Sequence, residues 1–259
     1  MQSCLFVYND GWDRVEGYAP RLLDSVILQP GEKEHLIEDI GRFRKSKRRY
    51  QRLGVPYHRG YLLYGPPGTG KTSVVSAVAG YFGLSIYSIN LADLNDRTLM
   101  NAVNLVMPNS VLLFEDIDCM KSGTSRVPAN TRTNEGKQGA DGKESATDRN
   151  GVTLSGLLNV LDGFYAPTNV LFMMTTNRIE MLDGALLRPG RIDYKLYLGK
   201  ASYRQKIELY CRFFEGVSEF EAAAFVETHA SVETMAEFQG LLLALEQEQA
   251  GRELAVANF

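Results

Sequence analysis

The sequence has little of what disulfide-bonded, membrane-spanning or nucleic-acid-binding proteins need. Its three cysteines, Cys4, Cys119 and Cys211, lie far apart in 259 residues, so they form neither a disulfide framework nor a metal-binding spacing, and a reducing compartment is expected. No apolar run is long enough to cross a bilayer. The net charge of −3 argues against charge-driven binding to nucleic acid or to an anionic membrane. With 44% hydrophobic residues, the composition predicts a globular protein with one large domain and room for a small second one.

What is present is a glycine- and proline-rich stretch, LLYGPPGTGKTSVV, that matches the P-loop pattern G-x-x-x-x-G-K-[ST]. An apolar run precedes it and helically spaced apolar residues follow it, which is the strand–loop–helix context that the motif requires. In such a loop, backbone N–H groups surround the β-phosphate at the start of a helix, and the lysine reaches the β- and γ-phosphates. We therefore expect a nucleotide and Mg²⁺ here, with Thr72 as a metal ligand. The predicted binding residues are Gly65, Pro66, Pro67, Gly68, Thr69, Gly70, Lys71, Thr72 and Ser73.

From Gly60 onward, short apolar segments alternate with helical ones, which is typical of a parallel sheet with helices on both faces. We expect an α/β fold whose five parallel strands are 60–64, 84–89, 111–114, 170–174 and 194–198. Residues 121–150 contain almost nothing apolar and are predicted to form a flexible surface insertion. The remainder, 200–259, is predicted to be wholly helical and to form a small C-terminal subdomain.

Three acids, Glu115, Asp116 and Asp118, follow one of the apolar strands, and Asn177 follows the next one. Ligands of open α/β sheets lie at this edge. One acid there can hold Mg²⁺ through water while its neighbour orients or deprotonates the attacking water, and an amide can hold the same water. Which of Glu115 and Asp116 is the base stays open.

Two further groups of basic residues each allow two interpretations. Arg188 and Arg191 lie on a predicted loop, ALLRPGR. Guanidinium groups stabilise the charge of phosphoryl transfer and are often supplied by a neighbouring subunit, although ordinary surface ion pairs would explain them too. The basic run RFRKSKRRYQR (42–52) is interpreted as a solvated helix end or as an anion or subunit contact.

The motifs GPPGTGKT, FEDID, TTN and LLRPGRID, in this order, resemble the AAA family of ring-forming ATPases. The stretches DSVIL, GVPYHRGYLLYGPPGTGKTS, LSGLLNVLDG and ALLRPGRID resemble one branch in particular, the Bcs-one-type mitochondrial chaperones. Members of that branch carry the folded Rieske iron–sulfur protein across the inner membrane for respiratory complex III. The resemblance runs from about Val7 to about Phe214 and concerns the ATPase region.

The resemblance implies ATP and ADP as the nucleotides and gives roles to particular positions. Carried over in chain order, these are Val26 against adenine, Lys71 and Thr72 in Walker A, Glu115 and Asp116 in Walker B with Glu115 at the metal, Asn177 as the first sensor, and Arg188 and Arg191 in the arginine-finger loop. Most AAA proteins end Walker B with Asp-Glu rather than Glu-Asp. The shorter base at Asp116 must therefore sit closer to its water or act through a second one, which predicts slow turnover.

The resemblance also implies a domain organisation and partners. Residues 1–24 would be a linker left from a missing N-terminal domain, 25–199 the large ATPase subdomain, and 200–259 a helical lid. A homo-oligomeric ring of roughly six or seven subunits is expected. The expected cargo is a protein, such as a Rieske iron–sulfur protein, and no nucleic acid is expected as a partner.

The same resemblance addresses location. The chain as given is expected to be soluble and to meet a membrane only through a missing N-terminal segment. Its expected home is the mitochondrial inner membrane, or the bacterial cytoplasm if it is a soluble relative. Two other functions remain open: an AAA-type ATPase acting on nucleic acid, which the basic run 42–52 favours, and a small-molecule P-loop kinase.

Overall fold

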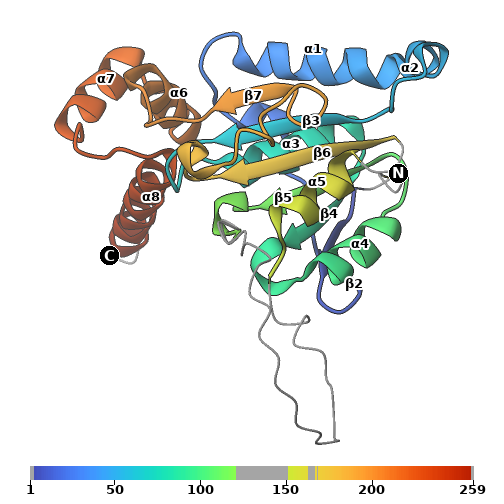
Figure 1. The fold of residues 1–259 in the computed structure, drawn as a ribbon. Coiled ribbons are helices and arrows are strands. Elements are labelled where there is room, and N and C mark those ends of the chain that lie inside the picture. Colours follow the sequence, from blue (N-terminus) through green and yellow to red (C-terminus); the bar gives the residue numbers. More distant parts are fainter. Residues whose placement is uncertain (1–2, 121–150, 163–166, 168, 258–259) are drawn as a thin grey trace, which may run out of the picture.

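The computed structural model describes residues 3–120, 151–162, 167 and 169–257 (Figure 1). At its centre is a seven-stranded sheet with the order β2-β1-β4-β5-β6-β3-β7. Neighbouring strands are parallel throughout, except that β1 and β2 are antiparallel. The predicted insertion, 121–150, lies outside the described residues. The strands are β1 (Leu5–Tyr8), β2 (Trp12–Arg14), β3 (Arg59–Tyr64), β4 (Ser85–Asn90), β5 (Ser110–Glu115), β6 (Val170–Thr176) and β7 (Tyr194–Tyr197).

The five predicted strands are present and parallel, but the predicted count of five is wrong because β1 and β2 extend the sheet at one edge. β1 pairs with β4, and the rings of Phe6 and Tyr87 stack with their centroids 4.7 Å apart. On β2, the indole N–H of Trp12 donates to the carbonyl of Ala102 at 3.0 Å. The partner of β1 lies far along the chain, so no local pattern marks the pairing. The domain boundaries stay a prediction.

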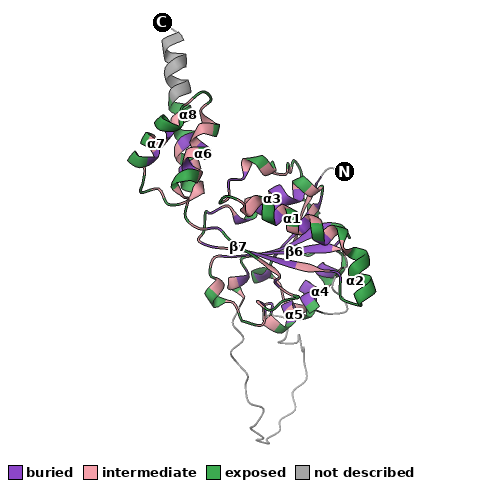
Figure 2. Cartoon of the chain, turned by 90° about the horizontal axis from the view of Figure 1, so that it is seen from above, coloured by how far each residue is buried: buried purple, intermediate pink, exposed green. Residues whose placement is uncertain are grey.

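Helices cover both faces of the sheet, which explains why the central strands are apolar without a break (Figures 1 and 2). Strand β5 shows the arrangement: Val111 and Leu113 pack into the core under one set of helices, and Leu112 and Phe114 into the core under the other. The first set is α1 (Glu32–Lys45), α2 (Lys47–Leu53) and α3 (Lys71–Phe82), and the second is α4 (Asp96–Asn104) and α5 (Leu154–Asp162).

The C-terminal part is helical, as predicted, and has a small core of its own. Its helices are α6 (Tyr203–Phe213), α7 (Glu219–Thr228) and α8 (Met235–Ala257), and they stand apart from the sheet in Figure 2. Leu209, Val226, Phe238 and Leu242 form this core together with Ile27, which comes from the segment before α1. Ile27 thus joins the C-terminal helices to the body. None of the helices in the described part of the chain is long and apolar enough to span a membrane.

A close backbone approach at Gly60, on β3, gives a stability prediction. A Cβ atom added there would lie 1.7 Å from the Arg191 carbonyl oxygen. That loop cannot easily retreat, because Asp193 N–H donates to the Gly60 carbonyl at 2.8 Å and its carboxylate accepts the Gly60 N–H at 3.1 Å. We expect Gly60→Ala to lower the free energy of unfolding, measured with urea, by about 1–3 kcal/mol or more.

Gly41 provides the matched control for this prediction. It lies inside α1, and a Cβ atom added there meets nothing within 4 Å. Gly41→Ala should therefore raise the free energy of unfolding by roughly 1 kcal/mol, the usual helix preference for alanine. Similar urea midpoints for both variants would contradict the close approach at Gly60.

Candidate active site

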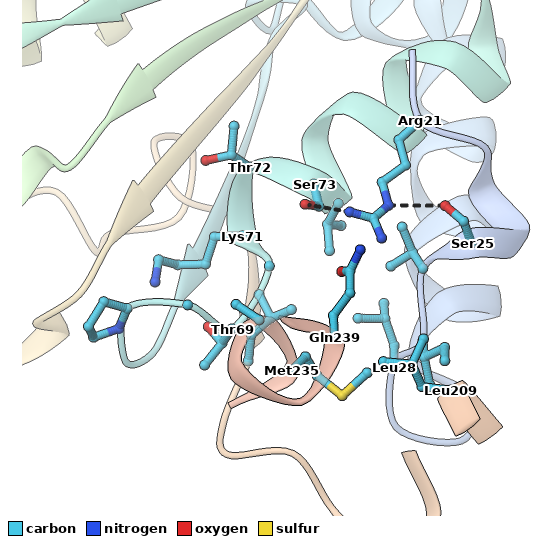
Figure 3. A pocket seen from close by; sticks show the side chains of 18 of the residues that line it. Arg21, Ser25, Leu28, Thr69, Lys71, Thr72, Ser73, Leu209, Met235 and Gln239 are labelled. Atoms are coloured by element: carbon cyan, nitrogen blue, oxygen red, sulfur yellow. Dashed lines mark hydrogen bonds between the residues drawn. The ribbon is translucent and has the colours of Figure 1, made fainter. Parts of the chain in front are cut away.

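A pocket of about 420 Å³ lies at the carboxyl edge of the sheet, where three distant stretches of chain meet (Figure 3). They are the P-loop with the start of α3, the segment 21–28, and the start of α8 together with Leu209 of α6. Asp116, Asn177 and Leu198, which follow β5, β6 and β7, complete the lining. One end is polar and carries Lys71, Asp116 and Asn177. The other end is apolar and is formed mainly by Val26, Ile27, Leu28, Leu198, Leu209 and Met235. A polar end beside an apolar end suits a phosphorylated ligand with a flat, weakly polar base.

The loop that precedes α3 has the conformation that anion binding requires. Gly65 has φ +141°, and a Cβ atom there would lie 2.0 Å from the Leu198 carbonyl oxygen, so only glycine fits. Helix α3 begins at Lys71 after Gly70, which has φ +92° and offers no side-chain cap. The first-turn N–H groups therefore lack partners inside the helix and face the pocket with the positive end of the helix dipole. Of the predicted residues 65–73, residues 67–73 line the pocket, whereas Gly65 and Pro66 do not line it and instead accept hydrogen bonds from Lys71.

The Lys71 side chain is folded back over the loop. Its ammonium group donates to the carbonyls of Gly65 and Pro66, both at 2.8 Å, and the residue is only 7% exposed. Burial lowers the pKa of Lys71, while the nearby carboxylates of Asp116 and Asp118 act in the opposite direction. The loop therefore holds the Lys71 ammonium beside the phosphate-binding position, and a bound phosphate would replace the two carbonyls as its hydrogen-bond acceptor.

Asp116 and Asn177 meet at the polar end of the pocket. Asp116 has φ +46°, which ends β5, and its N–H donates to the Thr175 hydroxyl at 3.1 Å. The Asn177 amide donates to the Asp116 carboxylate at 3.1 Å. Asp118 accepts from the Thr176 hydroxyl at 2.8 Å and from the Asn177 N–H at 3.2 Å. Asp118 therefore fixes the turn that carries Asn177, and Asn177 in turn orients the Asp116 carboxylate.

Glu115 is separated from Asp116 although the two are adjacent in sequence. Its carboxylate accepts a hydrogen bond of 3.1 Å from the Ser88 hydroxyl on β4, and it does not line the pocket. Among the described residues, no group of three or more His, Cys, Asp or Glu side chains could hold a metal ion. Nucleotide-bound Mg²⁺ instead takes phosphate oxygens, waters and one or two protein oxygens. The Thr72 hydroxyl lines the pocket and is an oxygen of that kind, whereas the predicted metal residue Glu115 lies outside the lining and can act only through water; on these terms the residues fit the ion.

The two predicted finger arginines lie outside the pocket and differ from each other. Arg191 forms an ion pair with Asp162 at the end of α5, with Nε 2.6 Å from a carboxylate oxygen, and its Nη1 donates to the Ala185 carbonyl at 2.6 Å. Arg188 is exposed and forms no ion pair within the described ranges 3–120, 151–162 and 169–257. Only Arg188 is therefore available to a second molecule.

Several lining residues are not predicted from the sequence. Arg21 and Ser25 come from the N-terminal segment, and Leu209, Met235 and Gln239 come from the C-terminal helices (Figure 3). No motif surrounds the residues of α6 and α8. Ser25 lies in the DSVIL stretch, which was the signal in the sequence that could have identified it. Val26, from the same stretch, is the predicted adenine contact, and it does line the pocket.

Residues 61–200 match the family model described as "ATPase family associated with various cellular activities (AAA)". "Probable mitochondrial chaperone BCS1-A" of Dictyostelium discoideum is 38% identical over 241 residues, which are 91% of this chain and 54% of that protein. "Mitochondrial chaperone BCS1" of Danio rerio is 38% identical over 236 residues, 89% of this chain and 54% of that protein. The chain thus spans about half the length of these curated relatives.

Proposed function

Because this chain belongs to the AAA family of ATPases, we propose that it hydrolyses Mg·ATP in the pocket beside Lys71 and uses the energy to move or remodel a protein. One observation carries the proposal. The P-loop lysine and a hydrogen-bonded carboxylate–amide pair, Asp116 with Asn177, lie in the same pocket. This combination supplies both a phosphate-binding cation and a group that can act on water.

Each polar group has a role in hydrolysis. Lys71 and the first-turn N–H groups of α3 bind the β- and γ-phosphates. Mg²⁺ would be held by the Thr72 hydroxyl, and Glu115, whose carboxylate accepts a hydrogen bond from Ser88, would act on the ion through water. When bound, Mg²⁺ neutralises phosphate charge as a Lewis acid.

Asp116 is the group that orients and deprotonates the attacking water, because it is the Walker B acid that lines the pocket. Asn177 keeps that carboxylate in place through its amide. The Asp116 side chain is one methylene shorter than glutamate, so it reaches the water less directly, and we expect slow turnover.

The site is completed by a neighbouring subunit in a homo-oligomeric ring. Arg188 is the arginine finger in this proposal, supported by its exposure and by its lack of an ion pair within the described residues. Helices α6–α8 act as a lid over the nucleotide. In support, the Ala236 N–H at the start of α8 donates to the Gly68 carbonyl of the P-loop at 3.2 Å.

The cargo is a protein, and we propose that it moves in folded form. The two relatives above are named mitochondrial chaperones, which supports a chaperone role in the mitochondrion. The inner membrane is the location that the family resemblance implies. A Rieske iron–sulfur protein is the specific candidate that the family resemblance implies.

Replacing Lys71 tests the nucleotide site. Lys71→Ala removes the main fixed cation on the transferred phosphate, so we expect ATP affinity, measured by titration calorimetry, to fall severely and hydrolysis to disappear. The fold should survive, because the Lys71 ammonium donates only to two loop carbonyls. Thermal unfolding without nucleotide checks this. Lys47→Ala, on the exposed surface of α2, removes the same charge and should change neither property. ATP affinity of the Lys71→Ala protein near that of the unchanged chain would contradict the assignment.

A further inference from the structure

An extended segment before α1 is fastened to the helix that follows the P-loop. The Tyr18 hydroxyl lies 2.8 Å from the Ser76 hydroxyl, which also accepts the Arg21 N–H at 3.1 Å. Pro20 packs against Gly80 of α3, and only glycine fits at position 80 because a Cβ atom there would lie 2.8 Å from the proline ring. Ser73, Ser76 and Gly80 are spaced three and four residues apart, so they share one face of α3. This face fixes the backbone of Arg21 relative to the P-loop.

The Arg21 side chain extends from this segment into the pocket (Figure 3). Its Nη1 donates to the Ser73 hydroxyl at 3.1 Å, and its Nε donates to the Ser25 hydroxyl at 3.0 Å. Within the described part of the chain, none of the ion pairs includes Arg21. Neutral hydroxyls orient the guanidinium without neutralising it, and donors remain for a ligand. A half-buried cation without an acidic partner calls for an anionic one.

The position of Arg21 in the pocket indicates which part of a nucleotide it meets. Lys71, Asp116 and Asn177 mark the end where the γ-phosphate reacts, and Leu28, Leu209 and Met235 mark the apolar end that suits the base. Arg21 is bonded to Ser73, two residues beyond Lys71 on α3, and lies toward the apolar end (Figure 3). In a nucleotide, the α-phosphate, which is attached to the nucleoside, lies between the reacting γ-phosphate and the adenine base.

We propose that Arg21 binds the α-phosphate of the nucleotide held by its own subunit, which deepens the proposed ATPase function and rests on it. A guanidinium matches phosphate oxygens with two parallel N–H groups, and Ser25 and Ser73 hold it ready for this contact. Because ATP and ADP share the α-phosphate, Arg21 strengthens the binding of both. It thus differs from Arg188, which acts on hydrolysis at a neighbouring site.

The experiment compares ligands with and without a phosphate. Arg21→Met keeps most of the side-chain length without the charge, and Arg21→Lys keeps the charge without the fork. Affinities for ADP and for adenosine are measured by displacement of a fluorescent ADP analogue. We expect Arg21→Met to weaken ADP by roughly 10- to 100-fold, the usual effect of a charged hydrogen bond, and to leave adenosine within about twofold. Arg21→Lys should recover part of the loss. Arg97→Met, on the exposed surface of α4, is the charge-matched control and should change neither affinity.

A role for Arg21 only as a structural strap gives a different result. ADP and adenosine would then weaken together, and thermal unfolding without nucleotide would shift in both variants, which would overturn the proposal. Unchanged ADP affinity in Arg21→Met would overturn it as well, while leaving the ATPase function standing. If the unchanged chain failed to bind ADP, both the proposed function and this assignment would be wrong.

Discussion

The Arg188→Ala protein is expected to bind ATP as the unchanged chain does and to hydrolyse it about 10³–10⁵ times more slowly. Arg188 lies outside the pocket, on an exposed loop after β6, so its loss leaves the P-loop of its own subunit intact. In the proposed ring it faces the γ-phosphate of the neighbour, where charge develops during transfer. ATP affinity and steady-state phosphate release, measured on the same preparation, separate the two effects.

Mixing two inactive proteins shows whether Arg188 acts between subunits. A Lys71→Ala subunit cannot use its own site, but it still carries Arg188. In mixed rings with Arg188→Ala, some sites with an intact Lys71 gain an arginine from the neighbour, so part of the activity should return. If mixed rings form and remain as inactive as each parent, the arginine does not act in trans.

Arg191 provides the control for Arg188 on the same loop. Its side chain is 20% exposed, and its guanidinium is hydrogen-bonded to Asp162 and to the Ala185 carbonyl within the same chain. Arg191→Ala leaves the Asp162 carboxylate without this partner and should lower the free energy of unfolding, by about 1–3 kcal/mol. Addition of the Lys71→Ala protein should not restore the lost stability of Arg191→Ala, because the defect lies inside the Arg191→Ala subunit.

The Asp116→Asn protein is expected to bind Mg·ATP normally and to hydrolyse it about 10²–10⁴ times more slowly. Asparagine keeps the size and one acceptor oxygen, so the hydrogen bond from the Asn177 amide survives while the base is lost. Single-turnover hydrolysis, compared with ATP affinity at saturating Mg²⁺, measures the separation of chemistry from binding.

Glu115→Gln is the matched comparison at the adjacent acid. The Glu115 carboxylate is turned toward the Ser88 hydroxyl rather than into the pocket, and glutamine can keep that hydrogen bond. We expect the main defect to be a shift of the Mg²⁺ dependence of hydrolysis to higher Mg²⁺ concentration, with a smaller loss of rate at saturating Mg²⁺ than in Asp116→Asn. If Asp116→Asn instead loses binding and turnover equally, Asp116 is the metal residue and Glu115 the base.

Local patterns in the sequence were enough to predict the parts of this protein that local physics determines. Apolar segments with helical segments between them predicted five parallel strands, and each strand is present. The P-loop motif predicted a phosphate-binding loop between a strand and a helix, and the loop does lie between β3 and α3, with positive φ angles at Gly65 and Gly70. Polar residues after two neighbouring strands predicted a shared edge, and Asp116 and Asn177 meet there. These features depend on residues that are close in the chain or on the general geometry of parallel sheets.

The tertiary structure decided what depends on contacts between distant segments. β1 was not predicted in the sheet because its partner, β4, becomes its neighbour only when the chain folds. The different orientations of Glu115 and Asp116 follow from the backbone turn at Asp116 and from Ser88 on another strand. Arg188 and Arg191 look alike in the sequence, and Asp162 of α5 pairs with only one of them. Arg21 lies on a segment with no motif. It reaches the pocket because this segment packs closely against α3, where Ser73 and Ser76 accept hydrogen bonds from Arg21 and Gly80 leaves room for Pro20.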